Sequence, residues 1–181
     1  LVAVTFKNLS ADPPSGGYNP ANGQPIGVTN KYTLFSFATG ATVANSDSAS
    51  TKWDIGFNGT KIIINSGTSG PGSAAALVVT GIFSELNLAP DAGYLTDNSA
   101  TATYAITRGS GKGWYNYDPS TNLISPIAGR IIMVKTSGGK YAKMEIISYY
   151  KDAPASPSAT STDRYYTFRY LYQPDGSKKL Q

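Results

Sequence analysis

The dominant pattern along the chain is alternation of apolar and polar residues with a period of two. In the stretch Thr51–Phe57, the side chains of Trp53, Ile55 and Phe57 share one face, as a half-buried β-strand requires. The same alternation predicts strands at Tyr32–Phe37, Thr60–Asn65, Ala75–Phe83, Thr101–Thr107, Arg130–Thr136, Tyr141–Tyr150 and Arg164–Gln173. Helical spacing never extends over three turns, although Phe83–Asp91 could form one short helical turn. The pattern therefore indicates an all-β protein.

Turn chemistry separates these segments. Asn58-Gly59 is a strong hairpin signal, because the central positions of a tight hairpin turn need positive φ, and Ser137-Gly138-Gly139 predicts a second hairpin. The segments Leu9–Asn30 and Asp152–Asp163 are rich in Pro, Gly, Ser and Asn without a hydrophobic period, which predicts long surface loops. We expect an antiparallel β-sandwich or a partly open barrel.

The length of 181 residues suits one domain. We expect residues 1–30, an N-terminal strand and a Pro/Gly-rich segment, to form one structural domain with the β domain of residues 31–181. A net charge of +4 with no basic run longer than Lys178-Lys179 gives no sign of nucleic-acid binding. No window is long and apolar enough to span a bilayer, and the first ten residues do not resemble a signal peptide.

The absence of histidine and cysteine excludes several kinds of active site. It removes Ser-His-Asp triads, H-E-x-x-H zinc sites and thiolate metal sites. Acidic residues such as Asp12, Asp91 and Asp152 lie beside Pro, Gly or Ala in apparent turns, where they commonly cap the backbone. The Gly109–Gly113 segment lacks both ends of a phosphate-binding loop. We therefore expect a protein that is not an enzyme.

The stretch from Thr107 to Pro126 is the best candidate for a ligand loop, because it combines glycines, cations and aromatic residues. Together with the preceding strand it offers a possible ligand pocket formed by Tyr104, Arg108, Lys112, Trp114, Tyr115 and Tyr117. Thioether sulfur and tyrosine oxygen can both ligate haem iron, so Tyr115, Tyr117, Met133 and Met144 are weak candidate ligands. The alternative for both methionines is core packing, which is the commoner role of Met in a strand.

Several motifs, taken in order, resemble one family. They are Leu34-Phe35-Ser36-Phe37 with Gly40, then Lys52-Trp53-Asp54, then Ser69-Gly70-Pro71-Gly72. The segments Asp91–Asp97, Gly111–Asp118, Arg130–Ala153 and the tyrosine-rich Tyr165–Tyr172 continue the match. Over residues 30 to 173 the chain resembles the HmuY-like proteins, haem-binding surface lipoproteins of Bacteroidetes.

This resemblance implies an all-β haemophore that is secreted or anchored to the outer membrane at the cell surface. It would capture haem for iron acquisition and deliver it to a TonB-dependent receptor, with membrane attachment only through an N-terminal lipid outside this chain. Family members hold haem between two loops through axial histidines or methionines. Here Asp118 or Pro119 occupies one ligand place, and the loop before Gly113-Trp114 offers neither residue type.

Three hypotheses for the loop therefore remain open. Haem would stack on Trp114, Tyr115 or Tyr117, with Arg108 or Lys112 against the propionates and a tyrosine or no side chain on the iron. Alternatively, the aromatic residues serve packing and the site has been lost. A third hypothesis is that the loop binds another apolar ring compound, a glycan or a protein.

The tripeptide Asp47-Ser48-Ala49 resembles an acceptor pattern for O-glycosylation in Bacteroidetes surface proteins. Ser48 is thus a candidate glycan acceptor, and the favoured interpretation of the tripeptide is a plain turn between strands.

Overall fold

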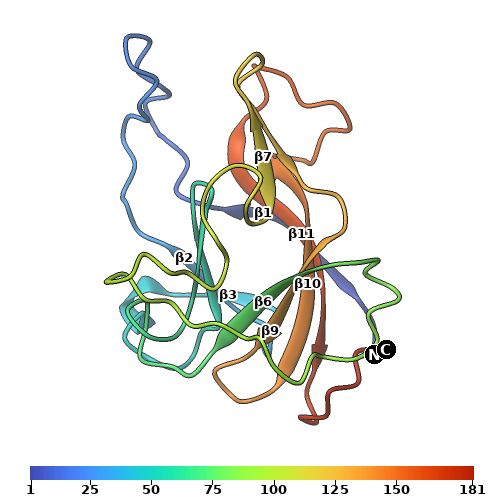
Figure 1. The fold of residues 1–181 in the computed structure, drawn as a ribbon. Helices are drawn as coiled ribbons and strands as arrows, with labels where there is room; N and C mark the ends of the chain where they lie inside the picture. Colours follow the sequence, from blue (N-terminus) through green and yellow to red (C-terminus); the bar gives the residue numbers. More distant parts are fainter.

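The computed structural model describes residues 1–181 as two antiparallel sheets and a separate hairpin (Figure 1). The five-stranded sheet has the order β1-β11-β10-β9-β6, and its strands are β1 (Val4–Ser10), β11 (Asp163–Gln173), β10 (Tyr141–Tyr150), β9 (Arg130–Lys135) and β6 (Ala75–Thr80). The four-stranded sheet has the order β3-β2-β4-β5, formed by β3 (Ala41–Val43), β2 (Thr33–Ser36), β4 (Ile55–Asn58) and β5 (Lys61–Ile64). The hairpin joins β7 (Tyr115–Asp118) to β8 (Leu123–Pro126), and a 3-10 turn, η1, covers Asn45–Asp47. The predicted all-β antiparallel fold is confirmed.

The main core lies between the two sheets. Alternate residues of β2, β4 and β5 point into it and meet the inward residues of β10 and β11. The ring of Phe35 lies 5.3 Å from that of Phe168 in an edge-to-face arrangement, and Phe57 lies 4.9 Å from Tyr166. Aromatic pairs at such spacings stabilise a core beyond the area they bury. The high tyrosine and phenylalanine content of the strands is thus explained by inter-sheet packing.

The other face of the five-stranded sheet is covered by the segment after β6 and by the C-terminal residues. Phe83, Ala89 and Leu180 pack there against Ile131, Met133 and Leu171. Lys143 is buried on this face, and its Nζ donates to the carbonyls of Phe83 and Leu86 at 2.7 and 2.9 Å. The amine thereby satisfies two carbonyls in the turn after β6. In the predicted helical segment Phe83–Asp91, only a single turn closes, by a hydrogen bond from Leu86 N to Ile82 O.

Both predicted hairpins are present, with one change in position. Asn58 pairs with Lys61, so the central residues of the β4–β5 turn are Gly59 and Thr60. Gly59 has φ of 53° whereas Thr60 does not have positive φ, which matches a turn that needs glycine only at its first central position. The β9–β10 turn contains Ser137-Gly138-Gly139 as predicted.

Most of the predicted strands are present, but the segment Thr101–Thr107 is not a strand. It forms turns and bends, with one isolated bridge between Asn98 and Thr103. Conversely, the sequence analysis did not predict β3, and it treated as a loop the region in which β7 and β8 pair. These strands are only three or four residues long, which leaves little alternation to detect. Asn122, with φ of 58°, lies in the turn between β7 and β8.

The first strand belongs to the same sheet as the end of the chain. β1 pairs with β11, with a bulge between Phe6 and Leu9, and Leu1 N donates to Gln181 O, so the termini lie side by side (Figure 1). The long predicted loops follow β1 and β10, although Leu9 and Ser10 are still in β1. No helix in the structure has the length and apolar character needed to cross a membrane.

Candidate functional site

The loop that leads to β7 is held in place by one buried carboxylate. Asp97 accepts hydrogen bonds from the backbone of Ile64 in β5 at 2.9 Å and from Ser69 Oγ at 2.7 Å. Its other oxygen accepts from the backbone of Ala105 at 3.0 Å. Buried backbone amides need such partners, because an unpaired one costs free energy. Asp97 therefore fixes the loop against the edge strand of the four-stranded sheet.

Two of the predicted pocket residues lie in the main core. Trp114 is 2% exposed, and its Nε1 donates to Thr60 O at 3.0 Å. Its ring lies 4.9 Å from that of Tyr115, which is 9% exposed, and 5.1 Å from that of Tyr166. These contacts place the indole behind the loop rather than on its surface.

The two methionines lie on opposite faces of the five-stranded sheet. Met144 is fully buried in the main core, and Met133 is 1% exposed in the second cluster, beside Phe83. Each sulfur is thus surrounded by the packing of its own layer. Nowhere in the structure do three or more carboxylates, histidines or cysteines form a group that could hold a metal ion.

Tyr104, Arg108 and Tyr32 come together beside the loop. The guanidinium carbon of Arg108 lies 3.5 Å from the centre of the Tyr104 ring, a cation–π contact, and its Nη2 donates to Tyr32 Oη at 3.4 Å. Arg108 forms no ion pair with a carboxylate, and its Nε is buried without a hydrogen-bond acceptor. Burial raises the pKa of the Tyr32 phenol, while the Arg108 cation opposes that rise. The cluster thus holds a cation with no carboxylate within ion-pair distance.

The sequence analysis did not include Tyr32 in the pocket. Tyr32 precedes Arg108 by 76 residues, and no local motif links the two positions. They meet because Tyr32 leads into β2 while the loop before β7 returns along the same sheet.

The other predicted pocket residues are more exposed. Tyr117 is 42% exposed, and its hydroxyl donates to Asn122 Oδ1 at 2.6 Å across the β7–β8 turn. Lys112 is exposed and forms no ion pair. The backbone of Tyr117 donates to Ser110 Oγ at 2.8 Å, which joins the glycine-rich segment to the hairpin.

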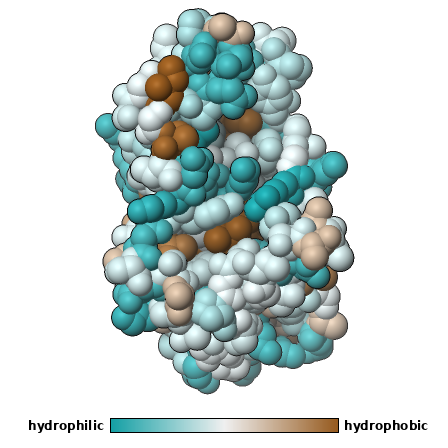
Figure 2. Space-filling model, turned by 90° about the vertical axis from the view of Figure 1, so that its left-hand side faces the viewer, coloured by the Kyte–Doolittle hydropathy of each residue, from teal (hydrophilic) through white to brown (hydrophobic).

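The outer face of the four-stranded sheet carries a small buried apolar cluster next to Tyr32. Leu34, Trp53 and Ile63 are buried there, with Tyr32 and Val43 packed against them. Figure 2 shows the side of the molecule that is on the left in Figure 1, where a hollow with hydrophobic atoms on its floor runs below a band of hydrophilic side chains. An apolar surface edged by a few polar groups is the usual composition of a small-molecule site.

The motifs that carry the family resemblance have structural roles. The Trp53 carbonyl accepts hydrogen bonds from Asn65 Nδ2 at 2.7 Å and Ser137 Oγ at 2.9 Å, and Asp54 accepts from the backbones of Phe37 and Ser137 at 2.9 and 2.8 Å. These bonds tie the β4 entry to β2 and to the β9–β10 turn. These hydrogen bonds give the motif residues a role in specifying the fold.

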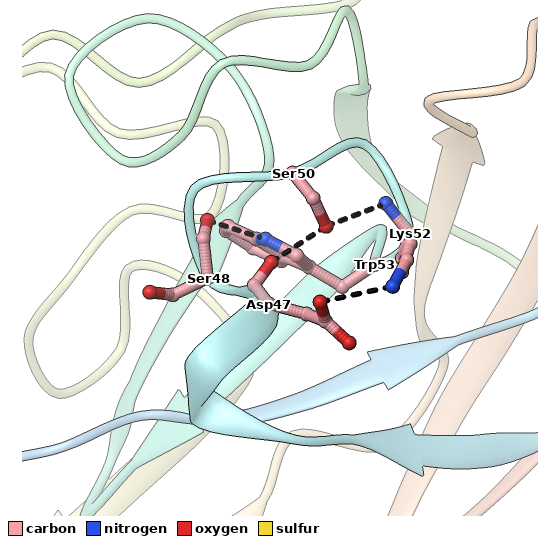
Figure 3. A network of polar contacts seen from close by, with 5 residues as sticks. All are labelled: Asp47, Ser48, Ser50, Lys52 and Trp53. Carbon is pink, nitrogen blue, oxygen red and sulfur yellow. Dashed lines mark hydrogen bonds and ion pairs between the residues drawn. The ribbon is translucent and has the colours of Figure 1, made fainter.

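The turn that contains Ser48 is closed by the network in Figure 3. Trp53 Nε1 donates to Ser48 O at 2.9 Å, and Lys52 Nζ pairs with Asp47 Oδ1 at 2.9 Å. Ser48 itself is exposed. Its glycosylation stays a prediction.

A groove of about 550 Å³ lies at the β9–β10 turn end of the molecule. Its lining includes the hydroxyl-bearing residues Ser36, Thr39, Thr42, Thr51, Thr136 and Tyr172, with Asp47 and Lys52 among its other lining residues. None of the residues predicted for the ligand pocket lines this groove.

Comparison with known structures identifies similar folds. The chain superposes on apo PinO from Porphyromonas gingivitis with a TM-score of 0.57 and 15% identity, covering 95% of this chain and 97% of that one. A protein of Bacteroides fragilis provisionally assigned as a lipoprotein gives a TM-score of 0.55, 15% identity and coverage of 95% and 91%. One of Bacteroides vulgatus, provisionally assigned as HmuY-like and haem-binding, gives 0.52, 16% identity and coverage of 93% and 89%. Comparison with curated protein sequences gives no match.

The family model for HmuY protein matches residues 28–170, which is well over half of the chain. This range agrees with the span of the resemblance found in the sequence. HmuY proteins are not enzymes, in line with the expectation from the missing histidine. The match of this family model over most of the chain shows that the protein belongs to the HmuY family.

Proposed function

We propose that this protein binds haem at the cluster of Tyr32, Tyr104 and Arg108 beside the loop before β7. The observation that carries the proposal is the unneutralised Arg108, whose guanidinium lies 3.5 Å from the Tyr104 ring centre and whose Nε has no acceptor. Haem combines an apolar ring with two anionic propionates, so it needs an apolar surface beside a cation. The half-buried rings of Tyr32 and Tyr104 provide apolar area beside that cation, and Tyr32 packs against the buried Leu34, Trp53 and Ile63. Membership of the HmuY family supports the same ligand.

The role proposed for each side chain follows from how exposed that side chain is. Tyr104 and Tyr117 are accessible for stacking, whereas Trp114 and Tyr115 support the loop from the core. Arg108 and Lys112 are the cations that could pair with propionates. Because Met133 and Met144 are enclosed by core packing, a tyrosine oxygen is the better candidate for the iron ligand.

Titration with haemin, followed by the Soret absorption band, tests the proposal. The wild-type protein should bind one equivalent saturably with a shifted Soret band. Replacing Arg108 by Gln should weaken binding roughly tenfold, because a charge-assisted hydrogen bond contributes about 1.5–3 kcal/mol. Arg130→Gln, at the start of β9, removes the same charge elsewhere and should leave binding unchanged. A flat titration of the wild-type protein would exclude haem as the ligand.

The family also suggests that the protein works at the cell surface, secreted or anchored by an N-terminal lipid, and delivers haem to a TonB-dependent outer-membrane receptor. Transfer of haem from the loaded protein to membranes that contain such a receptor, but not to membranes without it, would support this role.

If binding persists with metal-free porphyrin but haemin has no advantage, the protein is a module for apolar ring compounds instead.

A further inference from the structure

We propose that the oxygen of Tyr32 is the axial ligand of the haem iron, with Arg108 as the residue that stabilises it. The inference rests on the proposed haem function and adds a ligand that the sequence motifs do not indicate. Its basis is the hydrogen bond of 3.4 Å from Arg108 Nη2 to Tyr32 Oη. The Tyr32 hydroxyl donates to no protein acceptor, so its proton can leave without breaking an internal hydrogen bond.

The position of Tyr32 is fixed by the structure around it. The chain just before Tyr32 is anchored by Asp12, which accepts hydrogen bonds from the backbones of Thr29 and Asn30 at 2.8 and 2.7 Å. Asn58 Nδ2 donates to the carbonyl of Lys31 at 2.9 Å, which fastens the end of the long loop to β4. The Tyr32 ring then packs on the apolar outer face of the sheet. A ligand atom held in this way requires little ordering when iron arrives.

Three other tyrosines are less suited to ligation because their hydroxyls already donate hydrogen bonds within the protein. Tyr117 donates its hydroxyl hydrogen to Asn122, and Tyr18 donates to Asp163 at 2.5 Å. Tyr166 is fully buried and donates to Gly59 O. In each case coordination would break an existing hydrogen bond in which the tyrosine is the donor.

Coordination of iron by Tyr32 requires the loss of one proton and no redox reaction. The Tyr32 O–H bond breaks, the proton passes to solvent, and the oxygen lone pair forms a bond to Fe(III) without any change of oxidation state. Burial and the nearby Asp97 carboxylate raise the pKa of Tyr32, and the adjacent guanidinium of Arg108 offsets part of that rise by stabilising the phenolate. The guanidinium of Arg108 has five N–H donors, so it can face the ligand oxygen and still pair with a propionate, and the exposed Lys112 is available to the other propionate.

The test compares haemin with metal-free protoporphyrin IX in the wild-type protein and in Tyr32→Phe. Phenylalanine keeps the ring that packs on the sheet and removes only the ligand oxygen. We expect Tyr32→Phe to weaken haemin binding at least tenfold and to leave metal-free protoporphyrin binding within twofold. Resonance Raman spectra of the wild-type ferric complex should show phenolate ring modes enhanced by coordination, and these modes should be missing in the variant. Tyr141→Phe, in β10 against the second cluster and outside the proposed site, is the matched control and should retain them.

The outcomes separate this inference from the proposed function. If the wild-type protein binds no haemin, the proposed function fails and the inference fails with it. If haemin binds but Tyr32→Phe retains the phenolate modes and the full affinity, haem binding stands and Tyr32 is not the ligand. Equal weakening of haemin and metal-free porphyrin would show that Tyr32 contacts only the ring, which also overturns iron ligation.

Discussion

Single residues in the HmuY motifs are explained by the atoms that they contact. A Cβ on Gly70 would lie 2.2 Å from Asn65 Oδ1 and 2.6 Å from Trp53 Cζ2. Both neighbours are held in place, because Asn65 Nδ2 donates to two carbonyls and Trp53 is fully buried. The glycine of this motif is therefore required by close approach.

Replacing Gly70 by Ala should destabilise the protein by about 1–3 kcal/mol, because the added methyl group forces a well-packed region to shift. Urea denaturation measures the change as a lower midpoint. Gly138→Ala is the control, since the nearest atom to its Cβ would be Thr136 Oγ1 at 3.9 Å, and it should change the midpoint little. Equal effects of both substitutions would contradict the packing explanation.

At the scale of elements, the loop from Asp97 to Trp114 depends on tertiary contacts. The alternation in Thr101–Thr107 is typical of a strand, but its side chains serve other purposes. Ala105 and Ile106 are consecutive and both buried, which a regular strand with one buried face does not allow. The buried Asp97 accepts the Ala105 amide that a sheet partner would otherwise accept.

Asp97→Asn should loosen this loop and cost about 1–3 kcal/mol, because an amide NH₂ replaces an oxygen that accepts backbone or side-chain hydrogen bonds. Hydrogen exchange should accelerate at the amides of Ile64 and Ala105. Asp118→Asn, in the exposed β7–β8 turn, is the control and should leave both amides unchanged. Unchanged protection in Asp97→Asn would show that the loop is held by other contacts.

At the scale of the whole molecule, the raised pKa values of several tyrosines make the free energy of unfolding depend on pH in the alkaline range. Burial raises the pKa of Tyr94 to about 12, and burial also raises the pKa of Tyr166 well above its ordinary value. The pKa of Tyr18 also rises to about 12, through burial and its hydrogen bond to Asp163. These phenols keep their protons in the folded protein at pH values where the unfolded chain loses them.

The protein should therefore lose stability as pH rises from about 10 towards 12. In this window the unfolded chain binds fewer protons than the folded one, so the free energy of unfolding falls with pH. Thermal melts across this range measure the fall, and phenolate absorbance should show a late group of tyrosines that ionises only on unfolding. A constant melting temperature up to pH 12 would contradict the assignment of buried phenols.

The sequence by itself determined the all-β class, most strand positions, both hairpins and the family, because period-two alternation and turn residues are local properties of the chain. It also marked Tyr104, Arg108 and Lys112, since a cation and an aromatic in one glycine-rich loop are visible without a structure. Only the tertiary structure decided that Trp114 lies in the core and that Tyr32 meets Arg108. The physical reason is that burial and long-range contact depend on how the two sheets pack, and no local pattern encodes a pairing across 76 residues.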